Sequence, residues 1–161
     1  MDNWENAEQK RTIRTKTGRD VEITEKNIIL VKDGLLGFDG LENYALIPHG
    51  GDDSPFLLLQ SLDEPDLAFI TIDPRLFAAD YVPDLSAEDI ASLGIPDIAQ
   101  AVVLAIVVIP DDPRRMTANL QGPVIINVAT RTGRQMISRS VNHKVRHYIL
   151  GDPAAALTGN A

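Results

Sequence analysis

The sequence predicts a single domain that is mainly β, an antiparallel β-barrel or roll with one or two short helices. Short apolar or alternating runs, each bounded by turn residues, recur about every 8 to 12 residues, which is roughly the spacing of sandwiches and barrels. Only one stretch, residues 84–94, carries helix signals. The length agrees, because 161 residues are one domain's worth of chain and can bury a sizeable core.

The first half of the chain predicts two hairpins and two further strands. The expected strands cover residues 12–17, 20–24, 27–31, 44–48, 56–62 and 67–73. The first two alternate branched and charged side chains around Gly18, which predicts a hairpin with one solvated face. The last two form the second hairpin; Asp63 to Asp66 make its turn and Pro74 stops its second strand.

The second half predicts one helix, a central strand and a third hairpin. Ser86 caps a helix from Ala87 to Leu93, which Gly94 closes. Residues 102–109 are a continuous Val- and Ile-rich run, typical of a strand covered on both faces. The remaining expected pieces are strands at 124–129 and 135–138, joined by the turn R-T-G-R at 131–134, and an amphipathic segment of either type at 142–150.

Glycines and prolines mark positions assigned to backbone geometry. Gly34 and Gly37 enclose two leucines and precede Phe38, which predicts a tight bend whose apolar side chains plug a core or a groove. The bend is not a phosphate-binding loop, because it lacks the additional spaced glycine and the lysine that such a loop needs. Pro74 ends a strand, and Pro123 belongs to the turn Gln121-Gly122-Pro123 inside the stretch 116–128.

The chain is expected to divide into a flexible leader (residues 1–11), the barrel domain (12–150) and a flexible tail (151–161). Trp4 in the leader is expected to be either disordered or docked on the barrel. The sequence contains no cysteine, no signal-peptide pattern and no apolar run of the ~20 residues that span a bilayer. These features predict a cytoplasmic protein without membrane contact.

The charge is distributed unevenly. Residues 33–112 hold sixteen acidic side chains and one basic side chain, Arg75, whereas residues 113–161 hold seven basic side chains and one acidic one. An acidic middle repels phosphate, so direct nucleic-acid binding is not expected, and its field favours a basic protein partner. The alternative is that the acidic loops only keep the protein soluble.

The sequence contains few candidate catalytic residues. No serine lies in a G-x-S-x-G context, and no pair of carboxylates is fixed at a catalytic spacing. His143 and His147 would share a face if their segment were helical, but no acid lies nearby and Lys144 and Arg146 disfavour a cation. No metal, cofactor or catalytic residue is therefore predicted, and the protein is expected not to be an enzyme.

Two asparagines, Asn119 and Asn127, interrupt strand-like sequence in the stretch 116–128. Asn is depleted in strands, because its side chain competes for backbone hydrogen bonds. One interpretation is that the two amides satisfy nearby backbone groups at an edge or a turn. The other is that they belong to a polar surface that recognises another protein.

Several motifs together resemble the FliW family of flagellar assembly factors. They are G-L-L-G-F (34–38), L-Q-S-L (59–62), F-I-T-I-D-P (69–74), D-Y-V-P (80–83) and T-A-N-L-Q-G-P-V-I-I-N (117–127), followed by Gly133, Arg134 and Gln135. The resemblance covers about residues 12 to 150, in the same order. Residues 141–150 match the family's closing segment only loosely.

The resemblance implies a non-enzymatic regulator with a small barrel-like fold that binds two proteins. One is CsrA, an RNA-binding dimer that represses flagellin translation; the other is flagellin itself. It implies that the factor antagonises CsrA allosterically when flagellin has been exported. The alternatives are a flagellin-specific chaperone without effect on CsrA, and a small barrel hydrolase or flavin-binding barrel.

We predict that the partner surface combines an acidic turn, a strand end and polar positions of the stretch 116–128. An exposed strand edge could also take up an extended partner segment through its backbone groups. The candidate contact residues are Gln60, Ser61, Asp63, Glu64, Asp66, Asp73, Thr117, Asn119 and Asn127.

Overall fold

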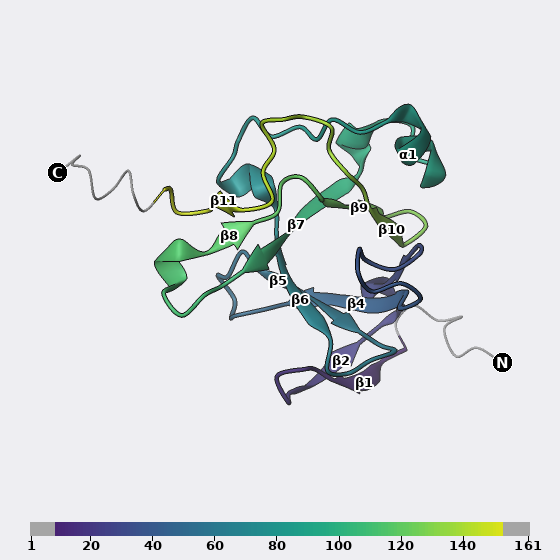
Figure 1. The fold of residues 1–161 in the computed structure, drawn as a ribbon. Helices are drawn as coiled ribbons and strands as arrows, with labels where there is room; N and C mark the ends of the chain where they lie inside the picture. Colours follow the sequence, from purple (N-terminus) through teal and green to yellow (C-terminus); the bar gives the residue numbers. More distant parts are fainter. Residues whose placement is uncertain (1–8, 153–161) are drawn as a thin grey trace.

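Seven strands close into a barrel in the computed structural model, which describes residues 9–152 (Figure 1). In space the strands follow the order β7-β6-β5-β4-β3-β10-β9, and β9 pairs with β7 to complete the ring. The barrel strands are β3 (Ile28–Val31), β4 (Asn43–Pro48), β5 (Leu57–Ser61), β6 (Ala68–Ile72), β7 (Val102–Val108), β9 (Val124–Asn127) and β10 (Thr132–Gln135). The predicted mainly-β barrel is confirmed.

One pair in the ring, β3 with β10, is parallel, and the other pairs are antiparallel. A closed ring with an odd number of strands cannot alternate direction all the way around, so at least one neighbouring pair must be parallel. The predicted antiparallel barrel is therefore observed with one parallel pair at this seam. Leu30 and Val31 face Thr132 and Gly133 there.

A small side sheet extends from the end of β7. Val102 to Leu104 pair with β9 in the barrel, whereas Val107 and Val108 pair with β8 (Thr117–Ala118), to which β11 (His147–Tyr148) adds a third strand. In Figure 1 this sheet projects to the left of the barrel. The two apolar runs of the stretch 116–128 thus lie in different strands of one nine-stranded sheet, β8 in the extension and β9 in the barrel, and the corner Gln121-Gly122-Pro123 joins them.

Strand β7 is covered on both faces, as its continuous apolar run predicts. Leu104 packs in the barrel interior with residues such as Tyr44, Leu59 and Ile126. Val103, Ala105 and Val107 face outward into a second cluster. Segments following β6 and the short helix α1 (Ala87–Ser92) contribute to this outer layer.

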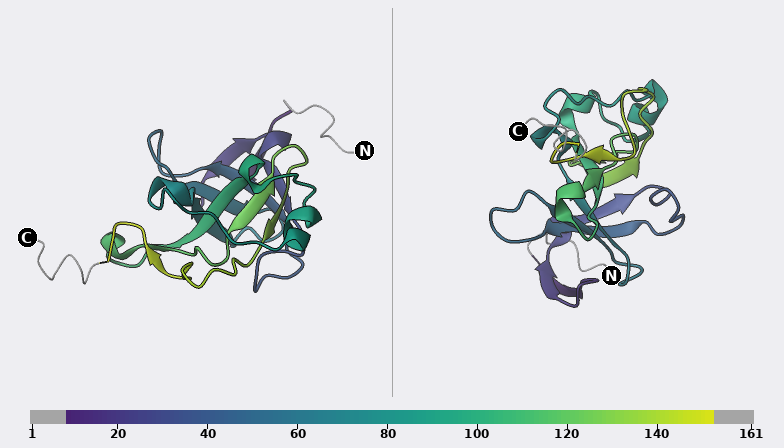
Figure 2. Two further views of the ribbon diagram at one scale, coloured as in Figure 1. Left: turned by 90° about the horizontal axis from the view of Figure 1, so that it is seen from above. Right: turned by 60° about the vertical axis from the view of Figure 1, so that its left-hand side comes forward.

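The N-terminal hairpin, β1 (Arg11–Arg14) with β2 (Asp20–Ile23), covers another outer face of the barrel. Ile23 packs with Ala45, Ile47 and Leu58 in a third cluster. Figure 2 shows the hairpin and α1 on different sides of the barrel. The hairpin prediction is confirmed, although β1 begins at Arg11, within the segment assigned to the leader. Trp4 lies outside the described residues.

The predicted helix is confirmed as α1, in which the Ser86 hydroxyl accepts a hydrogen bond from Asp89 N at 3.1 Å. The remaining helical pieces among residues 9–152 are single 3-10 turns: η2 (Glu25–Asn27), η3 (Pro74–Leu76), η4 (Ile98–Gln100) and η5 (Pro113–Arg115). None of these helices could cross a membrane.

One local prediction is wrong, and one question that the sequence left open is answered. The turn between β9 and β10 lies at residues 128–131, where Arg131 has a φ of 55°, and Thr132 to Arg134 belong to β10. The expected turn R-T-G-R fails because Gly133 fits inside the strand against Ile126 rather than bending it. His143 and His147 do not share a helix face, since residues 142–150 form turns and the strand β11.

Candidate partner-binding surfaces

We call residues 61–66, which connect β5 and β6, the acidic turn. Hydrogen bonds to two buried side chains, Gln60 and Ser61, fix its backbone. The Gln60 amide nitrogen lies 3.0–3.1 Å from the carbonyl oxygens of Ser61, Pro65 and Leu67. Its carbonyl oxygen accepts from Lys16 N at 2.7 Å, which ties the N-terminal hairpin to the turn. The Ser61 hydroxyl accepts from Asp63 N and Glu64 N, so the backbone of the turn has one defined shape.

Three exposed carboxylates project from this fixed backbone. Asp63 accepts hydrogen bonds from the backbone N and the side-chain amide of Asn43, and Glu64 accepts from Asp66 N. No ion pair to Asp63, Glu64 or Asp66 occurs in the described part of the chain. Their charge is therefore free to act on a partner.

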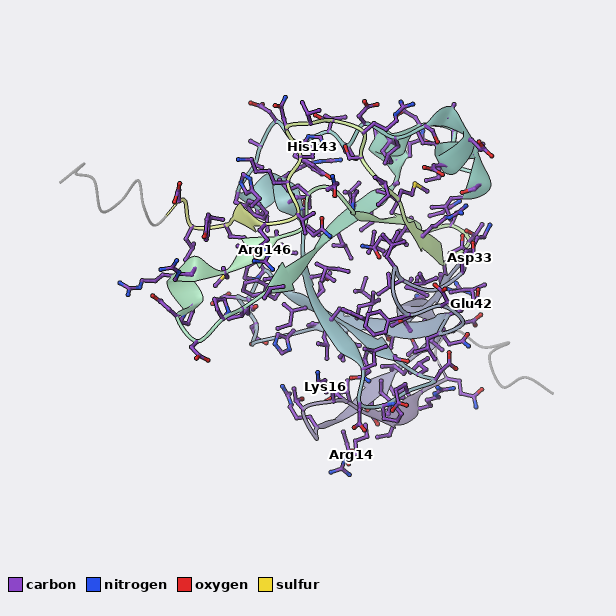
Figure 3. All side chains as sticks on the ribbon, in the orientation of Figure 1. Arg14, Lys16, Asp33, Glu42, His143 and Arg146 are labelled. Carbon is purple, nitrogen blue, oxygen red and sulfur yellow. The ribbon has the colours of Figure 1, made fainter. Side chains whose placement is uncertain are left out.

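The neighbouring loop between β3 and β4 adds further acids to this end of the barrel. Leu62 N donates to Asn43 O at 2.7 Å, which places the acidic turn beside the start of β4 and next to Glu42. Glu42 in turn accepts from Asp33 N at 2.8 Å (Figure 3). Burial, reinforced by the charge of Asp63, raises the pKa of the Tyr44 hydroxyl just inside.

A shallow cavity of about 460 Å³ borders the acidic turn. It is lined by Arg11, Glu25, Ile28, Leu30, Asn43, Leu62, Asp63, Thr130 and Arg131. Arg131 and Glu25 form an ion pair of 2.7 Å across it. Its lining mixes charges of both signs, so it does not define a ligand by itself.

Two of the predicted contact residues, Gln60 and Ser61, are buried, so their predicted contact role needs correction. Gln60 and Ser61 are 0% and 2% exposed, so they position the turn and cannot themselves touch a partner. Asp73 is exposed but lies at the opposite end of β6 from Asp66, where its carboxylate caps η3 by accepting from Arg75 N. It thus lies at a strand end separate from the acidic turn, as predicted, and its contact with a partner stays a prediction.

Both asparagines use their side chains to hold the backbone. The Asn119 side-chain oxygen accepts from Gln121 N and Gly122 N, which forms the corner of the stretch 116–128. Asn127 donates to Leu93 O at 2.8 Å and accepts from Ala129 N, which joins the end of β9 to the end of α1. These bonds favour the interpretation of structural amides.

Thr117 and Asn119 lie on a second surface, an apolar groove of about 340 Å³ at the mouth of the barrel. Its other lining residues are Leu35, Leu36, Phe69, Ile106, Val108, Gln135, Val145 and Arg146. No pattern in the sequence connects Val145 and Arg146 with Thr117. Only the G-L-L-G-F pattern, expected to plug a core or a groove, pointed to this place.

The loop of residues 34–38 is shaped by its glycines. Gly34 and Gly37 have φ values of 75° and 88°, in the left-handed region that favours glycine. Leu35 is buried in the barrel interior, and the ring of Phe38 contacts Phe69 edge-on at 5.2 Å. Pro74 and Pro123 are fully buried at their corners.

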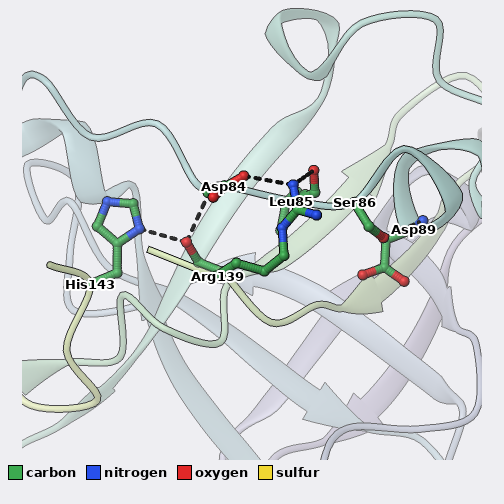
Figure 4. A network of polar contacts seen from close by, with 7 residues as sticks. Asp84, Leu85, Ser86, Asp89, Arg139 and His143 are labelled. Atoms are coloured by element: carbon green, nitrogen blue, oxygen red, sulfur yellow. Dashed lines mark hydrogen bonds and ion pairs between the residues drawn. The ribbon is translucent and has the colours of Figure 1, made fainter. Parts of the chain in front are cut away.

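Hydrogen bonds among Asp84, Ser138, Arg139 and His143 hold the segment after β10 to the outer layer (Figure 4). We call these four residues the polar clasp. The Ser138 hydroxyl lies 2.6 Å from His143 Nδ1 and accepts from Asp84 N at 2.9 Å. Arg139 donates to the Asp84 carboxylate and to Leu85 O. A serine beside a histidine could suggest a hydrolase, but Ser138 is only 2% exposed, so no substrate reaches its hydroxyl.

Replacing Ser138 with alanine should lower the free energy of unfolding by about 1 to 3 kcal/mol, because Asp84 N and His143 lose their shared partner in a buried place. Urea unfolding should show a lower midpoint with an unchanged slope. Ser140→Ala, which removes a hydroxyl bonded only to exposed Asn142 N, is the control. Equal midpoints for the two variants would contradict the clasp.

His143, His147 and Tyr81 pack against one another or against neighbouring groups. The His143 ring lies 4.7 Å from Tyr81, and the His147 ring lies 5.5 Å from Phe77. Burial, with a smaller effect from Lys144, lowers the pKa of His147. Burial raises the pKa of Tyr81, whose hydroxyl donates to Leu120 O. No group of three potential metal ligands occurs within residues 9–152.

The fold and these surfaces define a class: a small closed β-barrel with a fixed acidic turn beside an apolar groove. A family model described as FliW protein matches residues 12–149. The chain is 40% identical to the flagellar assembly factor FliW of Leptospira interrogans serovar Lai, over 90% of this chain and 97% of that protein. It is 43% identical to FliW of Leptospira biflexa, over 86% and 91%.

A solved crystal structure of the flagellar assembly factor FliW superposes with a TM-score of 0.80 at 32% identity, covering 89% of this chain and 99% of that one. The chain belongs to the FliW family of flagellar assembly factors. The resemblance seen in the sequence motifs is therefore confirmed. The matched relatives carry the name of an assembly factor, not of an enzyme.

Proposed function

We propose that this protein is a non-enzymatic cytoplasmic regulator that binds CsrA and allosterically antagonises its binding to RNA, and that also binds flagellin. While flagellin accumulates it occupies the protein; once flagellin is exported, the protein binds CsrA and relieves repression of flagellin translation. Family membership supports this proposal, because the matched relatives are flagellar assembly factors.

The observation that carries the CsrA part is the acidic turn. Its three carboxylates are exposed, lack ion pairs within residues 9–152 and stand on a backbone that Gln60 and Ser61 fix. A fixed acidic surface speeds association with a basic partner, and salt weakens this association. It also repels RNA phosphates near the bound partner.

The triple variant Asp63→Ala/Glu64→Ala/Asp66→Ala should bind CsrA about tenfold more weakly than the wild type, with a flatter dependence on salt. The reason is the loss of three negative charges from the contact. Calorimetric titration with CsrA at low and at moderate salt measures both effects. Binding by the wild type that the variant retains in full would remove the acidic turn from the interface.

A matched variant controls for net charge alone. Asp52→Ala/Asp53→Ala/Asp80→Ala removes three exposed carboxylates elsewhere on the surface and should retain most of the affinity. If the wild type fails to bind CsrA at either salt, the regulator proposal is wrong. Binding to flagellin alone would then favour a flagellin-specific chaperone.

A further inference from the structure

The apolar groove is a built surface and not a gap left between loops. One wall is the loop of residues 34–38, which Gln135 holds by accepting from Leu36 N at 2.8 Å. The same Gln135 amide donates to Gly122 O at 2.9 Å, which ties that loop to the corner next to Asn119. One side chain thus fixes the loop of residues 34–38 to the corner beside Asn119.

The opposite wall is fixed by backbone pairing. Leu120 N donates to Lys144 O, Ala118 faces His147, and Ile149 N donates to Met116 O. Residues 144–149 therefore run alongside β8, with Val145 and Arg146 on the groove. This order places the C-terminal segment opposite the loop of residues 34–38.

Large apolar side chains are left exposed on both walls. Leu36 is 56% exposed, Val108 63% and Val145 52%, and Phe38, packed on the groove residue Phe69, is 37% exposed. Beneath them, Phe69 and Ile106 continue into the barrel interior. A cluster of exposed apolar groups above a preformed hollow is typical of a protein-binding site.

The groove carries one formal charge, that of Arg146. Arg146 is exposed, and no ion pair to it occurs within the described residues. Figure 3 shows it across the molecule from Asp33 and Glu42. An occupant should therefore offer apolar side chains to the walls and a carboxylate to the guanidinium, since Arg binds carboxylates in fixed, directional geometry.

We propose that this groove binds flagellin, through an apolar segment that carries an acidic residue for Arg146. This inference rests on the proposed function, in which flagellin is the second partner, and it assigns that partner a surface different from the acidic turn. The basic partner CsrA does not fit a groove whose single charge is a cation, whereas it fits the three exposed carboxylates of the acidic turn.

The acidic turn adjoins the side of the groove formed by Phe69 and the loop of residues 34–38, whereas Arg146 lies on the far side (Figure 3). Phe69, on the groove, follows Asp66 by three residues, and Asn43, bonded to Asp63, begins the strand that follows the loop of residues 34–38. The two surfaces are distinguished by their chemistry, acidic in one and apolar in the other, and not by a large separation. Their neighbourhood fits a protein that exchanges one large partner for another.

The test is a crossed titration with purified flagellin and purified CsrA from the same organism. Val145→Asp and Arg146→Glu should each weaken flagellin binding about tenfold or more, and leave CsrA binding within about twofold. The triple alanine variant of the acidic turn should show the reverse pattern. Thermal melts should stay within a few degrees of the wild type, because both side chains are exposed.

Val141→Asp is the matched control. It places the same charge four residues earlier in the same segment, at a side chain that is 94% exposed and does not line the groove. It should bind flagellin like the wild type. A loss equal to that of Val145→Asp would overturn the groove assignment by showing a general charge effect.

Three results overturn the inference in different ways. If wild-type flagellin binding is retained by Val145→Asp and Arg146→Glu, the groove assignment is wrong while the proposed function stands. If the wild type does not bind flagellin at all, both the inference and the flagellin part of the proposed function are wrong. Weakened CsrA binding in the groove variants would likewise overturn the division into two surfaces.

Discussion

Replacing Gly34 with alanine is expected to destabilise the protein by about 3 to 5 kcal/mol. At a φ of 75° an alanine is strained, and its Cβ would lie 2.3 Å from Phe38 O and 3.1 Å from Leu41 O. These neighbours are backbone atoms of the same loop, so the contact can be relieved only by opening the loop. Leu35 and the wall of the groove would move with it.

The melting temperature measures this effect, since about 2 to 4 °C are lost per kcal/mol in a domain of this size. Gly37→Ala is the matched control in the same loop. Gly37 has a φ of 88°, but an added Cβ meets nothing within 4 Å, so only the strain of about 1 to 2 kcal/mol remains. Equal losses in both variants would show that the close contact at Gly34 does not matter.

The second large effect is expected for Gln60→Leu, with a loss of about 2 to 4 kcal/mol. Leucine fills similar space but leaves Lys16 N and Pro65 O without their partner. Leu67 O keeps its bond from Ser61 N, so the hairpin itself should survive. Chemical unfolding gives the size of the loss.

The same variant tests how the acidic turn works. Gln60→Leu leaves Asp63, Glu64 and Asp66 in place but removes the support beneath them, so weaker CsrA binding by the folded variant would show that a fixed backbone matters beyond charge. Gln121→Leu, at an exposed glutamine in the other turn, should change neither stability nor binding appreciably. Unchanged stability in Gln60→Leu would contradict the role given to the buried amide.

The two proposals assign partner binding to two adjoining surfaces, CsrA to the acidic turn and flagellin to the apolar groove. The acidic turn is rigid, charged and solvated, so it should govern the association rate and the salt dependence. The apolar groove is preformed, since Gln135 holds the loop of residues 34–38 to the corner beside Asn119, so it should govern the lifetime of a complex through buried apolar contacts. Kinetic measurements on the variants above can separate the two contributions.

Local features followed from the sequence because neighbours in the chain decide them. Alternation around Gly18 predicted the β1–β2 hairpin, Ser86 predicted the start of α1, and the Val- and Ile-rich run predicted the doubly covered β7. The two positive-φ glycines of G-L-L-G-F predicted a tight bend. The family motifs were also readable without coordinates.

The predicted contact residues were only partly placed by the sequence. It located the acidic turn correctly, but it could not distinguish Gln60 and Ser61, which hold the turn from inside, from the exposed Asp63 and Glu64 beside them. In a strand that ends in a turn, the side on which each polar side chain falls depends on what packs against it. Polarity by itself does not show that side.

The sequence by itself determined the β-rich class, most strand positions, the acidic middle and the family. Tertiary structure alone decided the odd-numbered ring with its parallel β3–β10 seam, the groove that joins Leu36 to Val145, and the bonds of Gln60 and Gln135. Lys16 and Gln60 are 44 residues apart in sequence, and Leu36 and Gln135 are 99 apart. The packing of whole strands determines such pairs. A side chain's long-range partner depends on strand register and on barrel closure, not on its neighbours in the chain.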